Sequence, residues 1–330
     1  MTFQTIKRLP KIELHSHLDG SISLATLKKL AKIAGKKLPP DEEVSRNLHV
    51  AANCQSLASY LKCFETVMPF LQNEEALKIV AYDLIAQAAD ENIIYIEVRF
   101  SPMLFKLEGL SEQEIIQSVA SGLKQGYLDY GVHSNMILCA MRGHDLETNK
   151  RVIDYAVSYR KIGVVGVDLA GDEAAYPPKM YLEWFDYAKE KAVNLTIHAG
   201  ECGSAANIRD SIVFGAKRIG HGTSMRGHQD LMATCIQHQI HIEMCPTSNL
   251  QTKAISTMDE YPFQAFYNAG ISLSINTDNR SVSRTTLTKE WQTLQVTTEV
   301  IQKITLDALE ASFATDEEKQ LLKEKITSFD

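Results

Sequence analysis

The sequence predicts an α/β protein, specifically a (β/α)8 TIM barrel with additional helices. Roughly eight apolar segments resemble strands, and nearly all are followed by a segment with helical periodicity. Strands that alternate with helices form a parallel sheet. Eight such units in a chain of 330 residues favour a closed barrel over an open sheet. No linker or repeat divides the chain, so residues 1–330 are expected to form a single domain.

The first predicted strand runs through the segment Lys11–Gly20 and ends in a glycine turn. Side chains alternate between the two faces of a strand, so His15 and His17 point the same way and Asp19 continues that face. Two imidazoles on one face form half of a metal site. The alternative is two surface histidines near a turn, and the rest of the chain must supply the missing ligands.

The segment after this strand is predicted to be either a lid or a poorly ordered stretch. A helix over 24–34 is followed from Pro39 by a polar stretch, expected to be irregular to about residue 55 and longer than most loops. A helix from Ser56 then carries apolar residues at helical spacing, a pattern typical of a core-facing stripe. The lid is therefore expected over about residues 35–70. The apolar stripe consists of Leu57, Tyr60, Leu61 and Phe64.

The remaining strands are short runs of aliphatic and β-branched residues. They are expected over 93–100, 134–141, 164–170, 193–199, 218–222, 240–245 and 271–278. Helices are predicted between them, one capped by Asn73 and another opened by a capping box of Ser111 and Glu114. Further helices are expected over 152–160, 181–187, 208–214 and 230–238, and in a helical tail over about 285–330 whose final helix is capped by Thr315 and Glu318.

The composition excludes several classes of function. A net charge of −7 without a Lys/Arg cluster argues against a nucleic-acid partner. No signal-peptide pattern and no long apolar segment is present, so we expect a cytoplasmic protein without a membrane partner. The six cysteines show no C-x-x-C spacing and are expected to be free thiols. No obligate protein partner is evident.

Polar residues gather where the predicted strands end, the place where parallel barrels carry their active sites. Four of the ten histidines lie at such ends, and the other six are interpreted as structural or solvated. The residues at the strand ends are His15, His17 and Asp19 after the first strand, His198 and Glu201 after the fifth, His221 after the sixth, and Asp278 and Asn279 after the eighth.

Three imidazoles and a carboxylate suit zinc better than calcium or magnesium. A catalytic zinc keeps one position for water and lowers the pKa of that water. Glu201 can give or take a proton beside it. Spacing alone leaves open whether His198 or His221 is the third imidazole ligand, and hydrogen bonding without a metal is the alternative. The pair His241-Ile-Glu243 is set aside, because no P-C-x-x-C follows and His241 starts its strand.

At these residues the sequence resembles the adenosine deaminase family of metal-dependent hydrolase barrels. The resemblance covers about residues 8 to 325. The motifs appear in family order: E-L-H-S-H-L-D-G from Glu13, V-R-F-S-P from Val98, D-L-A-G-D-E from Asp168, T-I-H-A-G-E from Thr196, R-I-G-H-G from Arg218, C-P-T-S-N from Cys245 and N-T-D-N from Asn276.

The resemblance implies an activity and a role for each residue. The activity is hydrolytic deamination of adenosine and 2′-deoxyadenosine to inosine or deoxyinosine and ammonia by a zinc-activated water. Glu201 would protonate purine N1, and His221 would orient and deprotonate the water. One zinc ion per subunit would be ligated by His15, His17, His198 and Asp278.

The resemblance also implies substrate contacts. Asp19 would hold a ribose hydroxyl, with His17 at the same end, and the backbone of Gly171 would approach purine N3. Tyr60, Leu61 and Phe64 would form an apolar gate over the pocket. Many members have an aspartate where this chain has Asn279. An asparagine amide donates to N7 without needing a proton, so the contact is expected to survive.

Other functions remain open at this point. One is deamination of another aminopurine, such as adenine or an aminofutalosine-type nucleoside. AMP is disfavoured because only Arg280 and Arg284 lie near a strand end, and both are expected to brace the last helix. A non-catalytic nucleoside-binding protein is a second alternative. A phosphotriesterase-like hydrolase is a third alternative. It would usually need a lysine or carboxylate that bridges two metals, and no lysine lies at a predicted strand end in the middle of this barrel. The expected partner is a small-molecule purine nucleoside.

Overall fold

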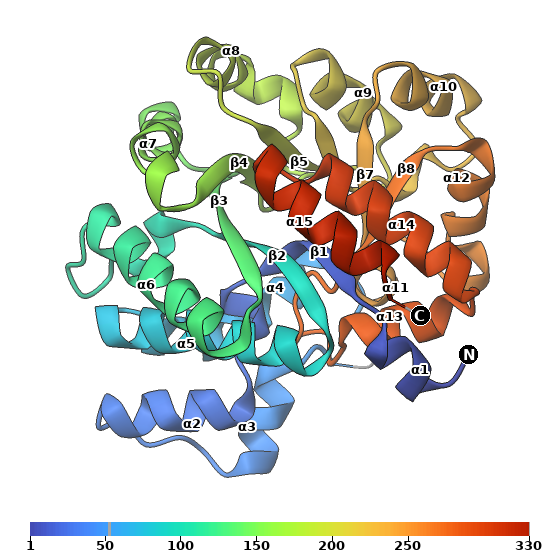
Figure 1. The fold of residues 1–330 in the computed structure, drawn as a ribbon. Coiled ribbons are helices and arrows are strands. Elements are labelled where there is room, and N and C mark those ends of the chain that lie inside the picture. Colours follow the sequence, from blue (N-terminus) through green and yellow to red (C-terminus); the bar gives the residue numbers. More distant parts are fainter. Residues whose placement is uncertain (52–53, 330) are drawn as a thin grey trace.

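A single sheet of eight parallel strands forms the centre of the protein (Figure 1). The computed structural model describes residues 1–51 and 54–329. Each strand pairs with the next along the chain, and a bridge between Ser16 and Asp278 joins the first strand to the segment after the last. This confirms the predicted (β/α)8 barrel. The strands are β1 (Lys11–His17), β2 (Ile93–Phe100), β3 (His133–Met141), β4 (Val164–Ala170), β5 (Leu195–Ala199), β6 (Arg218–His221), β7 (His241–Met244) and β8 (Ser272–Ile275).

Helices surround the barrel and bury their apolar faces against it (Figure 1). The capping boxes predicted at Ser111 and Thr315 are both present and open α6 and α15. Helix α14 packs against β8 and β1, with α15 beside it. The longer helices are α2 (Leu24–Ile33), α5 (Glu74–Asp90), α6 (Glu112–Tyr130), α7 (Leu146–Ser158), α8 (Leu182–Glu190), α9 (Ala205–Val213), α10 (Gln229–Gln237), α13 (Leu287–Leu294), α14 (Thr298–Ala311) and α15 (Asp316–Thr327).

The segment expected to be irregular contains a helix, α3 (Asp41–Leu48). Three acidic residues in its first turn stabilise the helix through its dipole. Val44 and Leu48, four residues apart and so on the same face, are both buried. The rest of the expected lid consists of α4 (Leu57–Leu61) and 3₁₀ turns over Lys62–Thr66 and Met68–Phe70. Residues 52 and 53 of the expected lid and residue 330 of the expected tail lie outside the described residues.

Other boundaries also differ from the expected ones. Helix α7 begins at Leu146 because Asp145 caps it, six residues before the predicted start. Two helices after β7 were not predicted, α11 (Pro246–Gln251) and α12 (Phe263–Ala269). Strand β8 ends at Ile275 instead of continuing to residue 278. The early end of β8 turns Asp278 toward β1.

Two expectations drawn from composition can be compared with the described residues. Within them, no helix is both long enough and apolar enough to cross a membrane. All six cysteines are free thiols, as predicted.

Candidate active site

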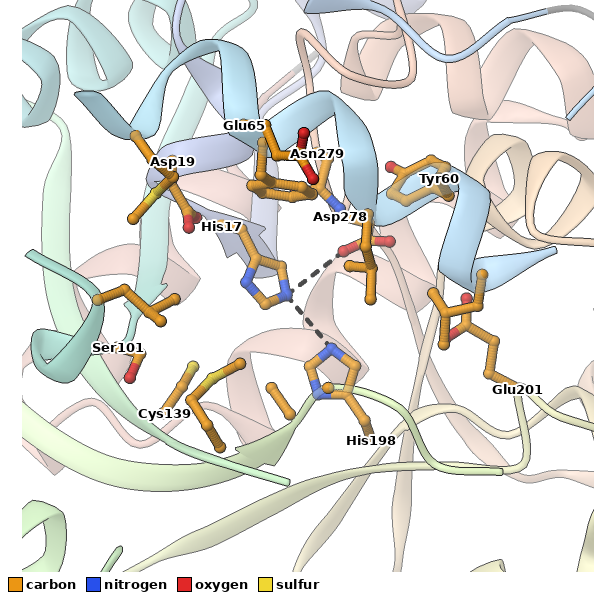
Figure 2. A pocket seen from close by; sticks show the side chains of 18 of the residues that line it. His17, Asp19, Tyr60, Glu65, Ser101, Cys139, His198, Glu201, Asp278 and Asn279 are labelled. Atoms are coloured by element: carbon orange, nitrogen blue, oxygen red, sulfur yellow. Dashed lines mark hydrogen bonds and ion pairs between the residues drawn. The ribbon is translucent and has the colours of Figure 1, made fainter. Parts of the chain in front are cut away.

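A cavity of about 380 Å³ opens at the carboxyl ends of the strands (Figure 2). The barrel lines it with residues of β1, β3, β4, β5 and β6 and of the segments that follow β2, β4, β5 and β8. The predicted gate residues Tyr60, Leu61 and Phe64 line it from the lid side. The Tyr60 hydroxyl lies 2.7 Å from Ser283 Oγ, which ties the lid to the turn after β8.

Four predicted ligands converge on one point beside this cavity. One potential ligand atom from each of His15, His17, His198 and Asp278 lies within 4.8 Å of every other. The Nε2 atom of His198 lies 3.1 Å from that of His15 and 3.2 Å from that of His17. Asp278 Oδ1 lies 3.4 Å from His17 Nε2 (Figure 2). His198, rather than His221, therefore supplies the third imidazole of the cluster.

Buried carboxylates orient two of the imidazoles. His15 Nδ1 lies 2.8 Å from Glu243 Oε2, and His198 Nδ1 lies 2.8 Å from Asp168 Oδ2. Each carboxylate accepts a proton held on Nδ1, which leaves the Nε2 lone pair facing the common point. Carboxylate partners of this kind are typical of metal-bound histidines. This donor set and its supporting carboxylates fit a zinc ion.

A buried arginine joins the two supporting carboxylates. Arg99 Nη1 donates to Asp168 Oδ2 at 2.9 Å, and Nη2 donates to Glu243 Oε2 at 2.7 Å. Glu243 also pairs with Arg218 Nε at 2.7 Å. Sequence reasoning did not assign roles to Arg99, Asp168 or Glu243, and it set Glu243 aside together with His241. The available signal was a charged residue inside an apolar strand, since a buried charge requires a partner.

Glu201 and His221 face the cavity next to the cluster. Thr252 Oγ1 donates to Glu201 Oε1 at 3.0 Å, and Glu201 Oε2 lies 3.6 Å from His221 Nε2. Burial, and then the negative charges of Asp278 and Glu173, raise the pKa of Glu201 well above its ordinary value. The raised pKa favours the protonated form of Glu201, which is the form that can act as an acid.

The backbone is strained at two of these positions. His221 has φ 68° and Asp278 has φ 60°, in the left-handed backbone region that residues other than glycine rarely adopt. Asp278 is fixed there by two hydrogen bonds to β1, from its own N–H to His15 O at 2.9 Å and from His17 N–H to its carbonyl at 2.7 Å. Backbone strain held by the surrounding structure is concentrated at functional sites.

The predicted substrate contacts lie around the same cavity. Asp19, Gly171 and Asn279 all line it, and Gly171 has φ 103°. Asp19 Oδ1 and Asn279 Oδ1 are buried without a hydrogen-bond partner among the described residues. Burial is the main cause that raises the pKa of Asp19 to about 6. Asp19 thus has an acceptor available to a ligand, whereas Asn279 Oδ1 lies against Gly20.

The two arginines near the end of β8 are turned away from the cavity. Arg280 is buried and pairs with Glu13 at 2.9 Å and with Glu91. Arg284 donates to Ser45 Oγ at 3.0 Å. Neither lines the cavity, which contains no lysine or arginine among the described residues.

This fold and this site define a class. A parallel barrel that gathers three imidazoles and a carboxylate at the carboxyl ends of its strands, with a free acid beside them, is a metal-dependent hydrolase barrel.

Comparison with known proteins identifies the family within this class. The adenosine deaminase family model matches residues 10–329. The chain is 44% identical to the adenosine deaminase of Enterococcus faecalis over 326 residues, 97% of each chain. It is 42% identical to that of Streptococcus agalactiae over 332 residues, 99% of this chain and 97% of the relative. The protein belongs to the adenosine deaminase family, whose members are hydrolytic deaminases.

A solved structure shows the same architecture. The arabidopsis N6-mAMP deaminase superposes with a TM-score of 0.89 at 28% identity, over 99% of this chain and 100% of the other. The barrel and its added helices are therefore shared along the whole length of both proteins.

Proposed function

We propose that the protein hydrolyses adenosine and 2′-deoxyadenosine to inosine or deoxyinosine and ammonia, with one zinc ion per subunit. The observation that carries the proposal is the buried Glu201 carboxyl group, 3.6 Å from His221 Nε2 at the edge of a four-ligand cluster, where burial raises its pKa and favours the protonated form. The proposed zinc ligands are His15, His17, His198 and Asp278. A bound zinc ion supplies Lewis acidity that lowers the pKa of a water molecule.

The chain's own residues then move the protons. Glu201 donates its proton to purine N1, which makes C6 electrophilic. His221 accepts the proton of the attacking water on Nε2 and passes it to the amino group, which leaves as ammonia. The proton of the new C6 hydroxyl returns to Glu201 as the carbonyl forms, so water and adenosine balance inosine and ammonia.

The ring of His221 is held by its neighbour Asn249. Asn249 Nδ2 lies 3.0 Å from His221 Nδ1, and the Tyr261 hydroxyl donates to Asn249 Oδ1 at 3.4 Å. These contacts fix the orientation of the imidazole, whose Nε2 lies 3.6 Å from Glu201 Oε2.

The other end of the cavity suits a nucleoside. The free acceptor of Asp19 can take a hydrogen bond from a ribose hydroxyl, with His17 beside it. Gly171, which has no side chain, allows the purine edge to approach the backbone. A volume of about 380 Å³ lies within the range of small-molecule pockets.

A nucleotide substrate is less well supported. Phosphate groups are recognised by arginine and lysine, and the described cavity lining has neither. The arabidopsis relative at 28% identity is an N6-mAMP deaminase, and a further arabidopsis structure at 28% identity and TM-score 0.88 has bound IMP. In this chain the described lining has four acidic residues and no basic residue other than histidine; the acidic residues are Asp19, Glu65, Glu201 and Asp278.

Ultraviolet spectroscopy on the zinc-loaded protein tests the proposal. Adenosine, 2′-deoxyadenosine, adenine and AMP are offered separately. We expect the aminopurine absorbance to fall with the two nucleosides and to stay constant with adenine and AMP. Turnover of adenine or AMP alone would reassign the substrate. No change with any of the four would overturn the proposal.

The contact of Asn279 with the purine gives a prediction of its own. We expect Asn279→Ala to raise KM for adenosine by about 2–10-fold, the effect of one neutral hydrogen bond, with unchanged metal content. Steady-state kinetics and metal analysis measure the two quantities. Loss of metal without a change in KM would instead show that Asn279 holds its neighbour Asp278 in position and does not bind the purine.

A further inference from the structure

One carboxylate lies under the turn that carries Glu201. Glu173, in the loop after β4, is 1% exposed. Its Oε1 accepts hydrogen bonds from Gly200 N–H at 2.6 Å and from Asn207 Nδ2 at 2.8 Å. Its Oε2 accepts from Glu201 N–H at 2.9 Å and from Cys202 N–H at 3.3 Å.

These bonds hold three consecutive peptide groups. The turn 200–202 leaves the barrel after β5, and its successive N–H groups converge on the same side chain. Three amides that point to one place form a nest for an anion. Glu173 supplies that anion from the loop after β4, so the path of the turn depends on a side-chain contact as well as on Gly200, whose φ is 81°.

The position of Glu201 depends on this turn. Its backbone N–H is held by Glu173, and its carboxyl group is held at the other end by Thr252. These two contacts act together with the strand before the turn and with the hydrogen bonds that Thr223 and Ser224 donate to Gly200 O. The negative charge of Glu173 also acts on Glu201 in the direction that favours its protonated form.

We propose that Glu173 is a positioning residue, which holds the turn 200–202 so that Glu201 meets the reacting ring of the substrate. This inference rests on the deaminase function proposed above. Glu173 does not line the cavity, and its role is carried entirely through the backbone of its neighbours.

Glu173→Gln tests the role with little change in size. A glutamine has one acceptor oxygen, and its NH₂ group would face N–H donors on the other side. The turn must therefore move. We expect kcat for adenosine to fall by about 10²-fold, the effect of a displacement of roughly 1 Å. We expect KM to stay within about threefold, because the contacts that bind the substrate equally in the ground and transition states remain. We also expect the metal content to equal that of the wild type.

Asn207→Ala is a milder variant if Glu173→Gln folds poorly. It removes one of the four donors and leaves the carboxylate and the three amides, so we expect kcat to fall about fivefold at unchanged KM. Glu290→Gln is the matched control. Glu290 is also fully buried and receives a backbone N–H, from Thr247 at 3.0 Å, but its other oxygen contacts the Thr285 hydroxyl. A hydroxyl can accept from a glutamine amide, so activity should be retained.

The outcomes separate the two proposals. A wild-type protein that deaminates none of the purines overturns the proposed function itself. An active wild type with Glu173→Gln and Asn207→Ala both at wild-type kcat overturns the positioning role alone. A fall in kcat that follows loss of metal overturns it as well, because Glu173 would then act on the metal cluster.

Discussion

Glu201→Gln is expected to abolish efficient turnover, with kcat for adenosine lowered by about 10²–10⁴-fold, the usual contribution of a general acid. The glutamine keeps the size of the side chain, and its oxygen can still accept from Thr252. Its amide is not an acid at any accessible pH and cannot protonate purine N1, whereas burial raises the pKa of the Glu201 carboxyl and favours its protonated form. The loss should therefore appear in kcat.

Metal analysis separates this chemical role from a structural one. Glu201 is not a member of the four-ligand cluster, so the variant should bind zinc with the same stoichiometry as the wild type. Initial rates from ultraviolet absorbance give kcat and KM. A variant that retained wild-type kcat would exclude Glu201 as the acid, and one that lost its metal would place it among the ligands.

The parts of the fold that follow from local pattern could be predicted. Most strands contain a short aliphatic run, as in β2 and β4. Period-two alternation correctly put His15 and His17 on one face. Helix α3 was missed because its only apolar signal is the pair Val44 and Leu48 in a polar stretch. Helix α11, six residues long and opened by Pro246, is too short to show a period.

The metal cluster could also be predicted, because its residues follow strand ends and parallel strands bring their ends together. The residues that support it could not. Arg99 and Glu243 are 144 positions apart in the chain and meet only through barrel closure. Glu173 has the same limitation, since its partners are backbone amides, which every residue but proline possesses. A buried charge in a strand indicates that a partner exists and gives no information on which residue it is.

Metal removal should have an effect as large as loss of the acid. We expect a chelator to abolish adenosine turnover and Zn²⁺ to restore it, because no other group in the described cavity can lower the pKa of water to the same degree. The cluster also predicts a change in stability that does not depend on activity. Zinc at 100 times its dissociation constant should stabilise the folded protein by about 2.7 kcal/mol, measurable as a rise in Tm.

Two histidine variants make this test specific. His15 lies on β1 and His241 lies on β7, and both are buried. Replacing either by alanine removes the same side-chain atoms. His241 begins β7 and contacts Ser272 Oγ at 2.7 Å, away from the cluster. We expect His241→Ala to lower Tm but keep the zinc-dependent rise, and His15→Ala to lose both the rise and the activity. If His15→Ala bound zinc with full stoichiometry and affinity, Glu243 would be orienting a histidine that is not a ligand. Arg99 would then serve the packing of the barrel and not its metal.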